Sequence, residues 1–157
     1  MKIRLLLPLL FSINAFSLEI YPLVSGEITM LKTTGSVVKK GDLLVQIDNT
    51  QATLELDYLK ALQKTYQQNF DDKQLELQQT QELYDRLVAS RRELTIVQLI
   101  FDKAKRELVA HNIKIKIANI ELTKYQIYAP LSGTIQATPN LRNATNINAP
   151  KILIVLE

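Results

Sequence analysis

The side chains that most often carry out catalysis form no recognisable set in this chain of 157 residues. His111 is the single histidine and cysteine is absent, so neither a cysteine nucleophile nor a disulfide framework exists. A lone histidine provides no metal site, which needs several ligands, and no glycine-rich phosphate loop is present. Asp71 and Asp72 fit an exposed helix surface. We therefore expect no enzyme and no metal or cofactor.

Arg86, Arg91 and Arg92 form the most distinctive polar cluster, close to a predicted reversal of the chain. Two arginines in the first turn of a helix oppose the helix dipole, which favours negative charge there. Two interpretations stay open: a docking site for an acidic or carbonyl-lined partner, and an ordinary solvated turn. Leu87 and Leu94 would be the apolar side chains beside these cations.

The region that positions this cluster contains no glycine and no proline from Gln51 to Tyr125. Steps of four and three residues through it meet mostly apolar side chains, as in a coiled coil. The first series is Ala52, Leu56, Leu59, Gln63, Tyr66, Phe70, Lys73, Leu77, Thr80, Tyr84 and Leu87. The second series is Leu94, Val97, Phe101, Ala104, Leu108, His111, Ile115, Ala118, Leu122 and Tyr125. One amphipathic helix cannot bury its apolar stripe alone, so we expect two arms that pair.

The reversal is predicted at Val88 and Ala89, because Ser90 and Glu93 have the Ser-x-x-Glu spacing of a capping box. Ser90 would then begin the second arm, and the two arms would be nearly equal in length. The alternative is one continuous helix that dimerises with a second chain. It is disfavoured because a single rod would hold the two β-rich ends of the chain apart. His111 would be a polar seam residue that fixes the register of the arms.

Segments of β character flank the helical region on both sides. Residues 18–50 contain short apolar runs, and Gly41 lies in a polar turn that tolerates positive φ. Residues 126–157 contain further strand candidates, with Gly133 marking a turn. The polar, asparagine-rich stretch 138–150 between those candidates is predicted to be a loop.

The first 17 residues have the composition of a secretory signal. Lys2 and Arg4 precede an apolar run, and cleavage is expected after Ser17. The run is shorter than the roughly 20 residues that a spanning helix needs, so an uncleaved anchor is the less favoured alternative. Removing the two basic residues from a chain of net charge +3 leaves 17 basic and 16 acidic side chains, a net of +1. Charge therefore does not indicate nucleic-acid binding.

The two β-rich ends resemble the two halves of one biotinyl/lipoyl-like domain. The first half-motif lies in Val24–Ile28, Gly35–Leu43 and Ile47–Asp48, and the second lies in Ile127–Ile135. A helical hairpin inserted between such halves is similar to the HlyD-like periplasmic adaptor family, also called membrane fusion proteins. The resemblance covers about residues 20–157. It implies an α+β fold, in which a lipoyl-like β-sandwich (barrel-sandwich hybrid) is built from both chain ends and carries a long antiparallel coiled-coil α-hairpin.

The expected organisation has four parts. These are a signal peptide at residues 1–17, the first half-domain at 18–50, the α-hairpin at 51–125 and the second half-domain at 126–157. Family members usually also carry a β-barrel domain and a membrane-proximal domain, and neither is recognisable here. We therefore expect a short form of the family. Either a second subunit supplies those domains, or this chain is a minimal adaptor that has a different partner.

The resemblance also implies a role in assembly, in a tripartite efflux pump or a type I secretion system. Several copies would form a homo-oligomeric ring in the periplasm, and peripheral association with the inner membrane is left open. The expected partners are an outer-membrane channel protein and an inner-membrane ABC or RND transporter, the latter directly or through a companion adaptor. Lipoyl and biotinyl carriers attach their cofactor to a lysine at a hairpin tip. That tip is opened here into the coiled coil, so no cofactor is expected on Lys39 or Lys40.

In the efflux branch of the family, the tip of the α-hairpin carries an arginine, a leucine and a serine and docks on the exit duct. The segments Tyr84–Leu87 and Ser90–Leu94 resemble the two sides of that tip. Leu87 and Ser90 are closer together than in the family by several residues. The candidate docking residues are Arg86, Leu87, Ser90, Arg91, Arg92 and Leu94.

A second hypothesis is a periplasmic coiled-coil chaperone or assembly factor that clasps unfolded clients. Such proteins also combine long helical arms with a small β-base, usually with a strongly basic surface. The net charge of +1 after signal removal argues against this class.

Overall fold

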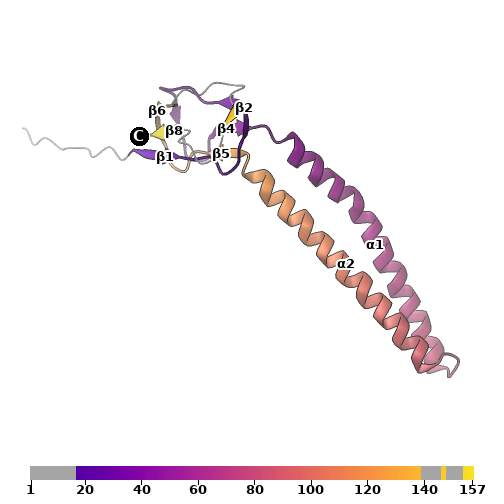
Figure 1. The fold of residues 1–157 in the computed structure, drawn as a ribbon. Helices are drawn as coiled ribbons and strands as arrows, with labels where there is room; N and C mark the ends of the chain where they lie inside the picture. Colours follow the sequence, from indigo (N-terminus) through magenta and orange to yellow (C-terminus); the bar gives the residue numbers. More distant parts are fainter. Residues whose placement is uncertain (1–16, 139–145, 148–153) are drawn as a thin grey trace, which may run out of the picture. The chain divides into compact units, whose positions relative to one another are not determined.

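The computed structural model describes residues 17–138, 146–147 and 154–157. The chain separates into two compact units. One unit contains the strands from both ends of the chain, and the other runs from Ile47 to Gln126 and consists mainly of two long helices (Figure 1). The predicted signal segment lies outside the described residues except for Ser17.

The strands of the described residues form two sheets of four strands each. The first sheet has the order β1-β8-β6-β3, with β1 at Leu18–Ile20, β8 at Ile154–Leu156, β6 at Gly133–Ala137 and β3 at Val37–Val38. The second has the order β5-β4-β2-β7, with β5 at Gln126–Tyr128, β4 at Leu43–Ile47, β2 at Gly26–Leu31 and β7 at Asn146–Ile147.

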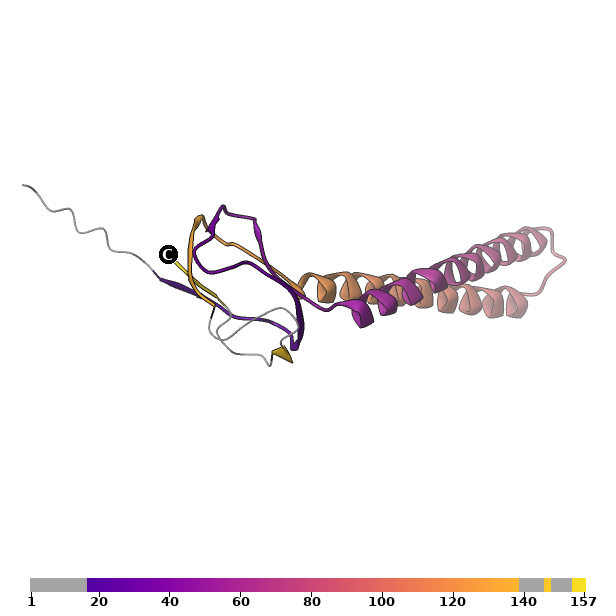
Figure 2. The same cartoon turned by 90° about the horizontal axis from the view of Figure 1, so that it is seen from above.

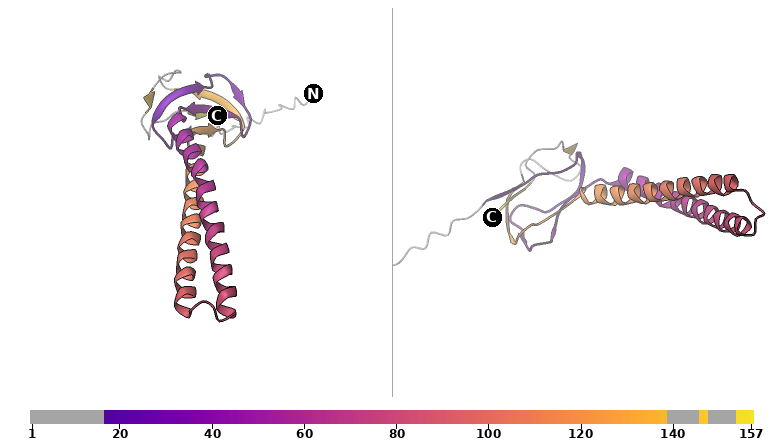
Figure 3. Two further views of the ribbon diagram at one scale, coloured as in Figure 1. Left: turned by 90° about the vertical axis from the view of Figure 1, so that its right-hand side faces the viewer. Right: turned by 90° about the horizontal axis from the view of Figure 1, so that it is seen from below.

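Both sheets mix strands from the two ends of the chain. β1 is antiparallel to β8, with Leu18 opposite Leu156, and β3 is antiparallel to β6, with Val37 opposite Thr134. Ribbons from the start and the end of the colour scale therefore lie side by side in the β unit (Figure 2, Figure 3). The predicted α+β fold, with one β-sandwich built from both chain ends, is confirmed.

Aliphatic side chains from both ends of the chain fill the interior of the β unit. The fully buried ones include Ile28, Val38, Leu44, Val45, Ile135, Ile154 and Leu156. Burying one such side chain contributes roughly 1.5–3 kcal/mol, and neither chain end has enough of them to form a core alone. The two halves must therefore fold together.

The polar stretch 138–150, predicted to be a loop, contains one of these strands. β7 pairs with β2, and this pairing places Ile147 opposite Gly26 and buries the isoleucine side chain. The loop prediction was wrong at residues 146–147, because one buried isoleucine is enough to anchor a two-residue strand inside a polar sequence. Residues 139–145 and 148–150 lie outside the described part of the chain.

Gly133 begins strand β6, so its prediction as a turn residue was wrong. The glycine is needed for a close backbone approach. A Cβ atom at this position would lie 2.5 Å from the Glu157 carbonyl oxygen and 3.1 Å from Leu156 Cδ2. The Thr134 N–H donates to that same carbonyl at 2.7 Å, and the Glu157 N–H donates to the Thr134 carbonyl at 3.0 Å. Gly41, in contrast, has φ of 91°, as its predicted turn requires.

In the second unit, helix α1 spans Thr50–Asp85 and helix α2 spans Arg91–Thr123. The helices lie side by side and antiparallel (Figure 1, Figure 3). Where the arms begin and end, the Ile47 N–H donates to the Tyr125 carbonyl at 2.9 Å. The alternative of one continuous helix is therefore excluded. No helix in the described part of the chain combines the length and the apolar character needed to cross a membrane.

The seam between the arms consists of the two predicted heptad series. Every member is buried or half-buried except Gln63 and Leu87. The Gln63 side-chain amide still donates across the seam, to Asn112 Oδ1 at 3.3 Å. Leu87 was wrongly placed on the seam, because α1 ends at Asp85 before reaching it.

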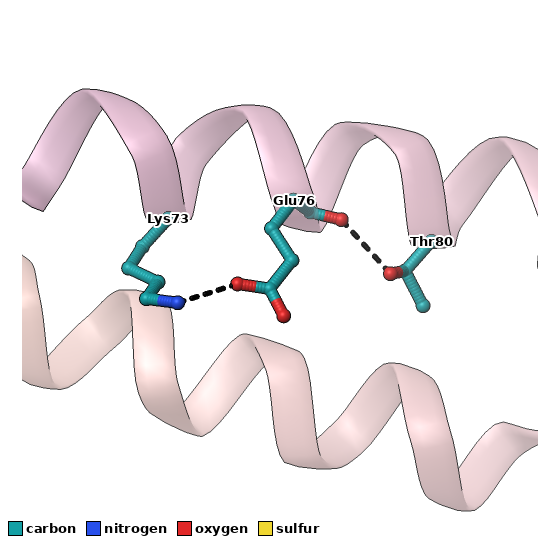
Figure 4. Close-up of polar contacts among 3 residues, drawn as sticks. All are labelled: Lys73, Glu76 and Thr80. Atoms are coloured by element: carbon teal, nitrogen blue, oxygen red, sulfur yellow. Dashed lines mark hydrogen bonds and ion pairs between the residues drawn. The ribbon is translucent and has the colours of Figure 1, made fainter.

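Two other polar members of the α1 series, Lys73 and Thr80, form their polar contacts within their own helix. The Lys73 ammonium lies 2.7 Å from a Glu76 carboxylate oxygen, and the Thr80 hydroxyl donates to the Glu76 carbonyl at 2.8 Å (Figure 4). The lysine and glutamate side chains are about one-third and two-fifths exposed, so this ion pair adds little to stability. It lets polar side chains lie at the edge of an otherwise apolar seam.

His111 is the buried polar residue of the seam, with only 3% of its surface exposed. Its Nε2 lies 2.8 Å from the Leu59 carbonyl oxygen, and this contact requires the ring nitrogen to donate. The imidazole also stacks on Tyr66, with ring centroids 4.4 Å apart and planes inclined by 21°. Both contacts join α2 to α1, so His111 links the arms by packing and by a hydrogen bond.

Two substitutions test these interiors. Gly133→Ala would push a methyl group into the Glu157 backbone, and we expect the unfolding free energy to fall by about 1–3 kcal/mol. Gln136→Ala, at an exposed position of the same strand, removes a side-chain hydrogen bond to the Glu157 carboxylate and should change it by less than about 1 kcal/mol. Thermal and denaturant unfolding of both variants would check this. Equal stabilities would show that the sheet can absorb a Cβ at this position.

His111→Ala would remove the stacked ring and leave the seam underpacked. We expect the unfolding free energy of this variant, followed by the loss of the helical signal, to be about 2–3 kcal/mol lower than that of the wild type. Asn112→Ala is the matched control, because the side chain of this neighbouring residue makes only the long hydrogen bond to Gln63 within the described residues. Urea unfolding followed by circular dichroism measures both. A smaller effect for His111→Ala than for Asn112→Ala would contradict a structural role for the histidine.

Candidate docking site at the hairpin bend

The end of helix α1 is closed by a Schellman-type arrangement of backbone hydrogen bonds. The Leu87 N–H donates to the Tyr84 carbonyl at 2.9 Å, and the Val88 N–H donates to the Leu83 carbonyl at 2.8 Å. Arg86 is the C-cap residue, so Leu87 occupies the next position, where this motif needs a left-handed backbone and usually has glycine. The bend is therefore ordered by its own hydrogen bonds.

Leu87 adopts the conformation that a glycine would normally provide. Its φ is 62°, and it is the only non-glycine residue with positive φ in the described part of the chain. A branched side chain in this region is strained by about 1–2 kcal/mol. The side chain is also 93% exposed, so packing within the chain does not compensate for that strain. Folding of the hairpin alone would favour glycine at this position.

The start of helix α2 is closed by the predicted capping box, which is confirmed. Ser90 Oγ accepts from the Glu93 N–H at 3.2 Å, and the Ser90 N–H donates to the Glu93 carboxylate at 2.7 Å. The Ser90 hydroxyl donates to the same carboxylate oxygen at 2.8 Å. The backbone bond first, and the hydroxyl bond second, hold the pKa of Glu93 below its ordinary value.

The three arginines at the bend are exposed, and none takes part in an ion pair among the described residues. Arg86 lies at the C-terminal end of α1, where the helix dipole favours a cation. Arg91 and Arg92 lie in the first turn of α2, where the dipole disfavours one. The bend therefore presents unpaired positive charge on both sides of an exposed leucine.

The six predicted docking residues differ in what they offer to a partner. Leu87 and the three arginines are exposed, whereas Leu94 is half-buried as a member of the seam. The Ser90 hydroxyl is exposed but already bonded to Glu93. Val88 was predicted as a bend residue and not as a docking residue. Its side chain is 72% exposed beside Leu87, and an apolar residue in a predicted turn was the available signal.

A barrel-sandwich domain split by an α-hairpin defines the class of membrane fusion proteins. The comparison with family models agrees with this class: the model described as "RND MFP, barrel-sandwich hybrid domain" matches residues 17–155. MFP stands for membrane fusion protein. The chain belongs to this family.

Three solved structures illustrate the similarity. MacA from Actinobacillus actinomycetemcomitans is 29% identical with a TM-score of 0.62, over 93% of this chain and 50% of MacA. The membrane fusion protein Spr0693 from Streptococcus pneumoniae R6 is 13% identical with a TM-score of 0.68, over 90% of this chain and 59% of Spr0693. ZneB from Cupriavidus metallidurans is 19% identical with a TM-score of 0.62, over 92% of this chain and 61% of ZneB. At these identities the last two show the fold alone.

The chain thus spans between 50% and 61% of the length of these three structures. A search of curated proteins found no match.

Ser90→Ala should lower the unfolding free energy of the hairpin by about 1 kcal/mol at neutral pH, because the cap loses its hydroxyl bonds. The pKa of Glu93 is lower in the folded state than in the unfolded state. The stability that the ionised carboxylate contributes is therefore complete above the ordinary carboxyl pKa, and it is lost as the pH falls through the folded-state pKa. The difference between wild type and Ser90→Ala should therefore narrow in acid. Thermal unfolding across this pH range measures it, with Glu93→Gln as the control that lacks the titrating group. A difference independent of pH would contradict this account.

Proposed function

We propose that this protein is a periplasmic adaptor subunit of a tripartite efflux or type I secretion system. It acts as a scaffold without enzymatic activity and bridges an inner-membrane transporter and an outer-membrane channel. Family membership supports the adaptor role, and the motif resemblance supports the choice of partners. The transporter is of the ABC or RND type, contacted directly or through a companion adaptor. The signal segment at residues 1–17 directs the chain to the periplasm.

The hairpin supplies reach in this proposal. An α-helix rises 1.5 Å per residue, so the 36 residues of α1 extend over roughly 54 Å. The seam contacts hold the two arms together along this length, including the Phe70–Phe101 ring pair with centroids 5.4 Å apart. Such a pair of helices is stiff and keeps the bend at a fixed distance from the start of the arms, whereas a flexible loop with the same number of residues would not.

The docking proposal rests on the exposure and the backbone conformation of Leu87. It combines 93% exposure with a strained backbone in a bend whose hydrogen bonds are otherwise complete. Strain at an exposed position is a feature of functional sites, because it brings no benefit to the fold itself. With Arg86 and Arg91 on either side, the bend offers an apolar anchor within a cationic rim. That combination suits a partner surface with an apolar pocket surrounded by carboxylates or carbonyls.

The chaperone alternative also has one observation in its favour. Several apolar side chains along the outer side of α2 are exposed, among them Leu99, Ile117 and Ile120. A clasping chaperone would use such a surface for unfolded clients. Light scattering with an unfolded outer-membrane protein separates the two functions, since only a chaperone suppresses its aggregation.

Leu87→Gly is the sharpest test of docking. Glycine relieves the left-handed strain, so the variant should unfold with a free energy higher by about 1 kcal/mol. It also removes the anchor, so capture of a purified outer-membrane channel should weaken on the order of tenfold. Thermal unfolding and a pull-down with the channel measure the two effects. A variant that is more stable and captures the channel as well as wild type would refute docking through Leu87.

Charge reversal at the bend provides a second test. Arg86→Asp combined with Leu87→Asp should abolish capture, because it removes the anchor and inverts part of the rim. Arg106→Asp combined with Val109→Asp is the matched control, since it makes the same change of charge at two exposed positions of α2 away from the bend. Unchanged capture by the bend variant, or equal loss in the control, would exclude the bend as the docking site.

A further inference from the structure

An open groove of about 840 Å³ lies between the two arms of the hairpin. Its floor consists of seam residues, among them Ala52, Leu59, His111 and Ala118. The alanines at two of these seam positions leave space that a leucine would fill. The volume lies within the range of pockets that hold small molecules in proteins, roughly 300–1,000 Å³.

The rims of the groove are formed by side chains next to the seam. Glu55 and Tyr58 lie along α1, and Lys114, Ile117 and Glu121 lie along α2. All five residues are exposed. Each rim therefore offers an apolar side chain with a charged side chain beside it.

Two carboxylates lie at nearly the same level of the groove. The hydrogen bond between Gln63 and Asn112 marks one level on both arms. Glu55 lies eight residues from Gln63 toward the start of α1, and Glu121 lies nine residues from Asn112 toward the end of α2. The Lys124 ammonium lies 2.5 Å from the Glu121 carboxylate, whereas Glu55 has no ion-pair partner in the described part of the chain. This level therefore retains a negative charge that a bound cation would balance.

An apolar pair and then an ammonium group follow in the direction of the bend. Tyr58 and Ile117 each lie five residues from the Gln63–Asn112 bond, so they lie at one level on opposite rims. Lys114 lies two residues from that bond, and it forms no ion pair among the described residues. The order along the groove is thus negative, apolar and positive.

The spacing of the two charged levels sets the length of a matching ligand. Glu121 and Lys114 are seven residues apart on one helix, which corresponds to roughly 10 Å. Three residues of extended peptide span about the same distance. The side chains of Tyr66 and Tyr125 also line the groove, and neither hydroxyl forms a hydrogen bond within the described residues. These hydroxyls are available to the peptide groups of such a ligand.

We propose that this groove binds short zwitterionic peptides of about three residues with an apolar residue in the middle. The peptide amine lies between Glu55 and Glu121, and the peptide carboxylate pairs with Lys114. The central side chain packs between Tyr58 and Ile117. An organic cation would leave the lysine without a partner, and an apolar helix would leave both charged levels uncompensated. The site goes beyond the adaptor role, because it gives the hairpin a small ligand of its own.

The peptide Ala-Trp-Ala with free ends is the probe for this site. The chain contains no tryptophan, so the emission and anisotropy of the peptide indole report binding to the full chain directly. Acetylation of the peptide amine and amidation of its carboxylate each remove one charge. We expect each blocked peptide to bind more weakly on the order of tenfold, because a charge-assisted hydrogen bond is lost.

Charge-neutralising variants assign the two ends of the peptide. Glu55→Gln should weaken binding of the free peptide but not that of the acetylated peptide, and Lys114→Gln should do the same for the amidated peptide. Asp57→Asn and Lys116→Gln are the matched controls. Each makes the same change of charge at an exposed position two residues away that does not line the groove. Both controls should bind the free peptide as well as wild type does.

Ala118→Leu tests the groove itself, because it adds apolar volume to the floor without changing the charge. This variant should lose peptide binding while thermal unfolding shows that the arms still pair. Full binding by Ala118→Leu, equal effects of the rim variants and their controls, or no indole signal at millimolar peptide would overturn the proposal. Tighter binding of the amidated peptide than of the free peptide would overturn it in favour of an organic cation. No channel or transporter is present, so the result is independent of the adaptor function.

Discussion

Pairing between the first and last strands of the chain is the constraint on which the rest of the structure depends. β1 needs β8, and β3 needs β6, to complete one sheet. The chain that leaves β4 at Ile47 must therefore return at Gln126, whatever lies between. A single long helix cannot meet this condition, whereas two antiparallel helices of similar length can. The hydrogen bond from Ile47 to Tyr125 closes the inserted segment at the point of return.

The two helices of the hairpin bury only a few side chains completely between them. Leu56, Leu59, Ala104, Leu108 and His111 are the buried side chains of the two helices, and the other seam residues are at most half-buried. Two helices in contact can cover only one face of each, and most helix stability in proteins comes from packing of that face. Apolar side chains on the outer faces have no such cover in one chain.

The sequence was sufficient to predict the features that depend on local pattern. The heptad spacing predicted the seam because helix periodicity decides which side chains face the partner arm, and the Ser90–Glu93 spacing predicted the cap because its hydrogen bonds are local. Features set by distant partners were missed. Ile147 forms a strand only because β2 lies beside it, and Gly133 is required only because Glu157 approaches it. The left-handed backbone at Leu87 was missed because leucine gives no sign of it and the heptad series extends through it.

The candidate site depends on this last feature. Caps on both sides give the bend a defined backbone, so the positions from which its exposed side chains project are fixed. An ordered contact surface loses less conformational entropy on binding than a mobile loop would. Glycine at position 87 would make the same turn without strain, but it would offer no apolar surface. The strain at Leu87 is therefore consistent with a bend whose side chain serves a partner, because the hairpin itself gains nothing from it.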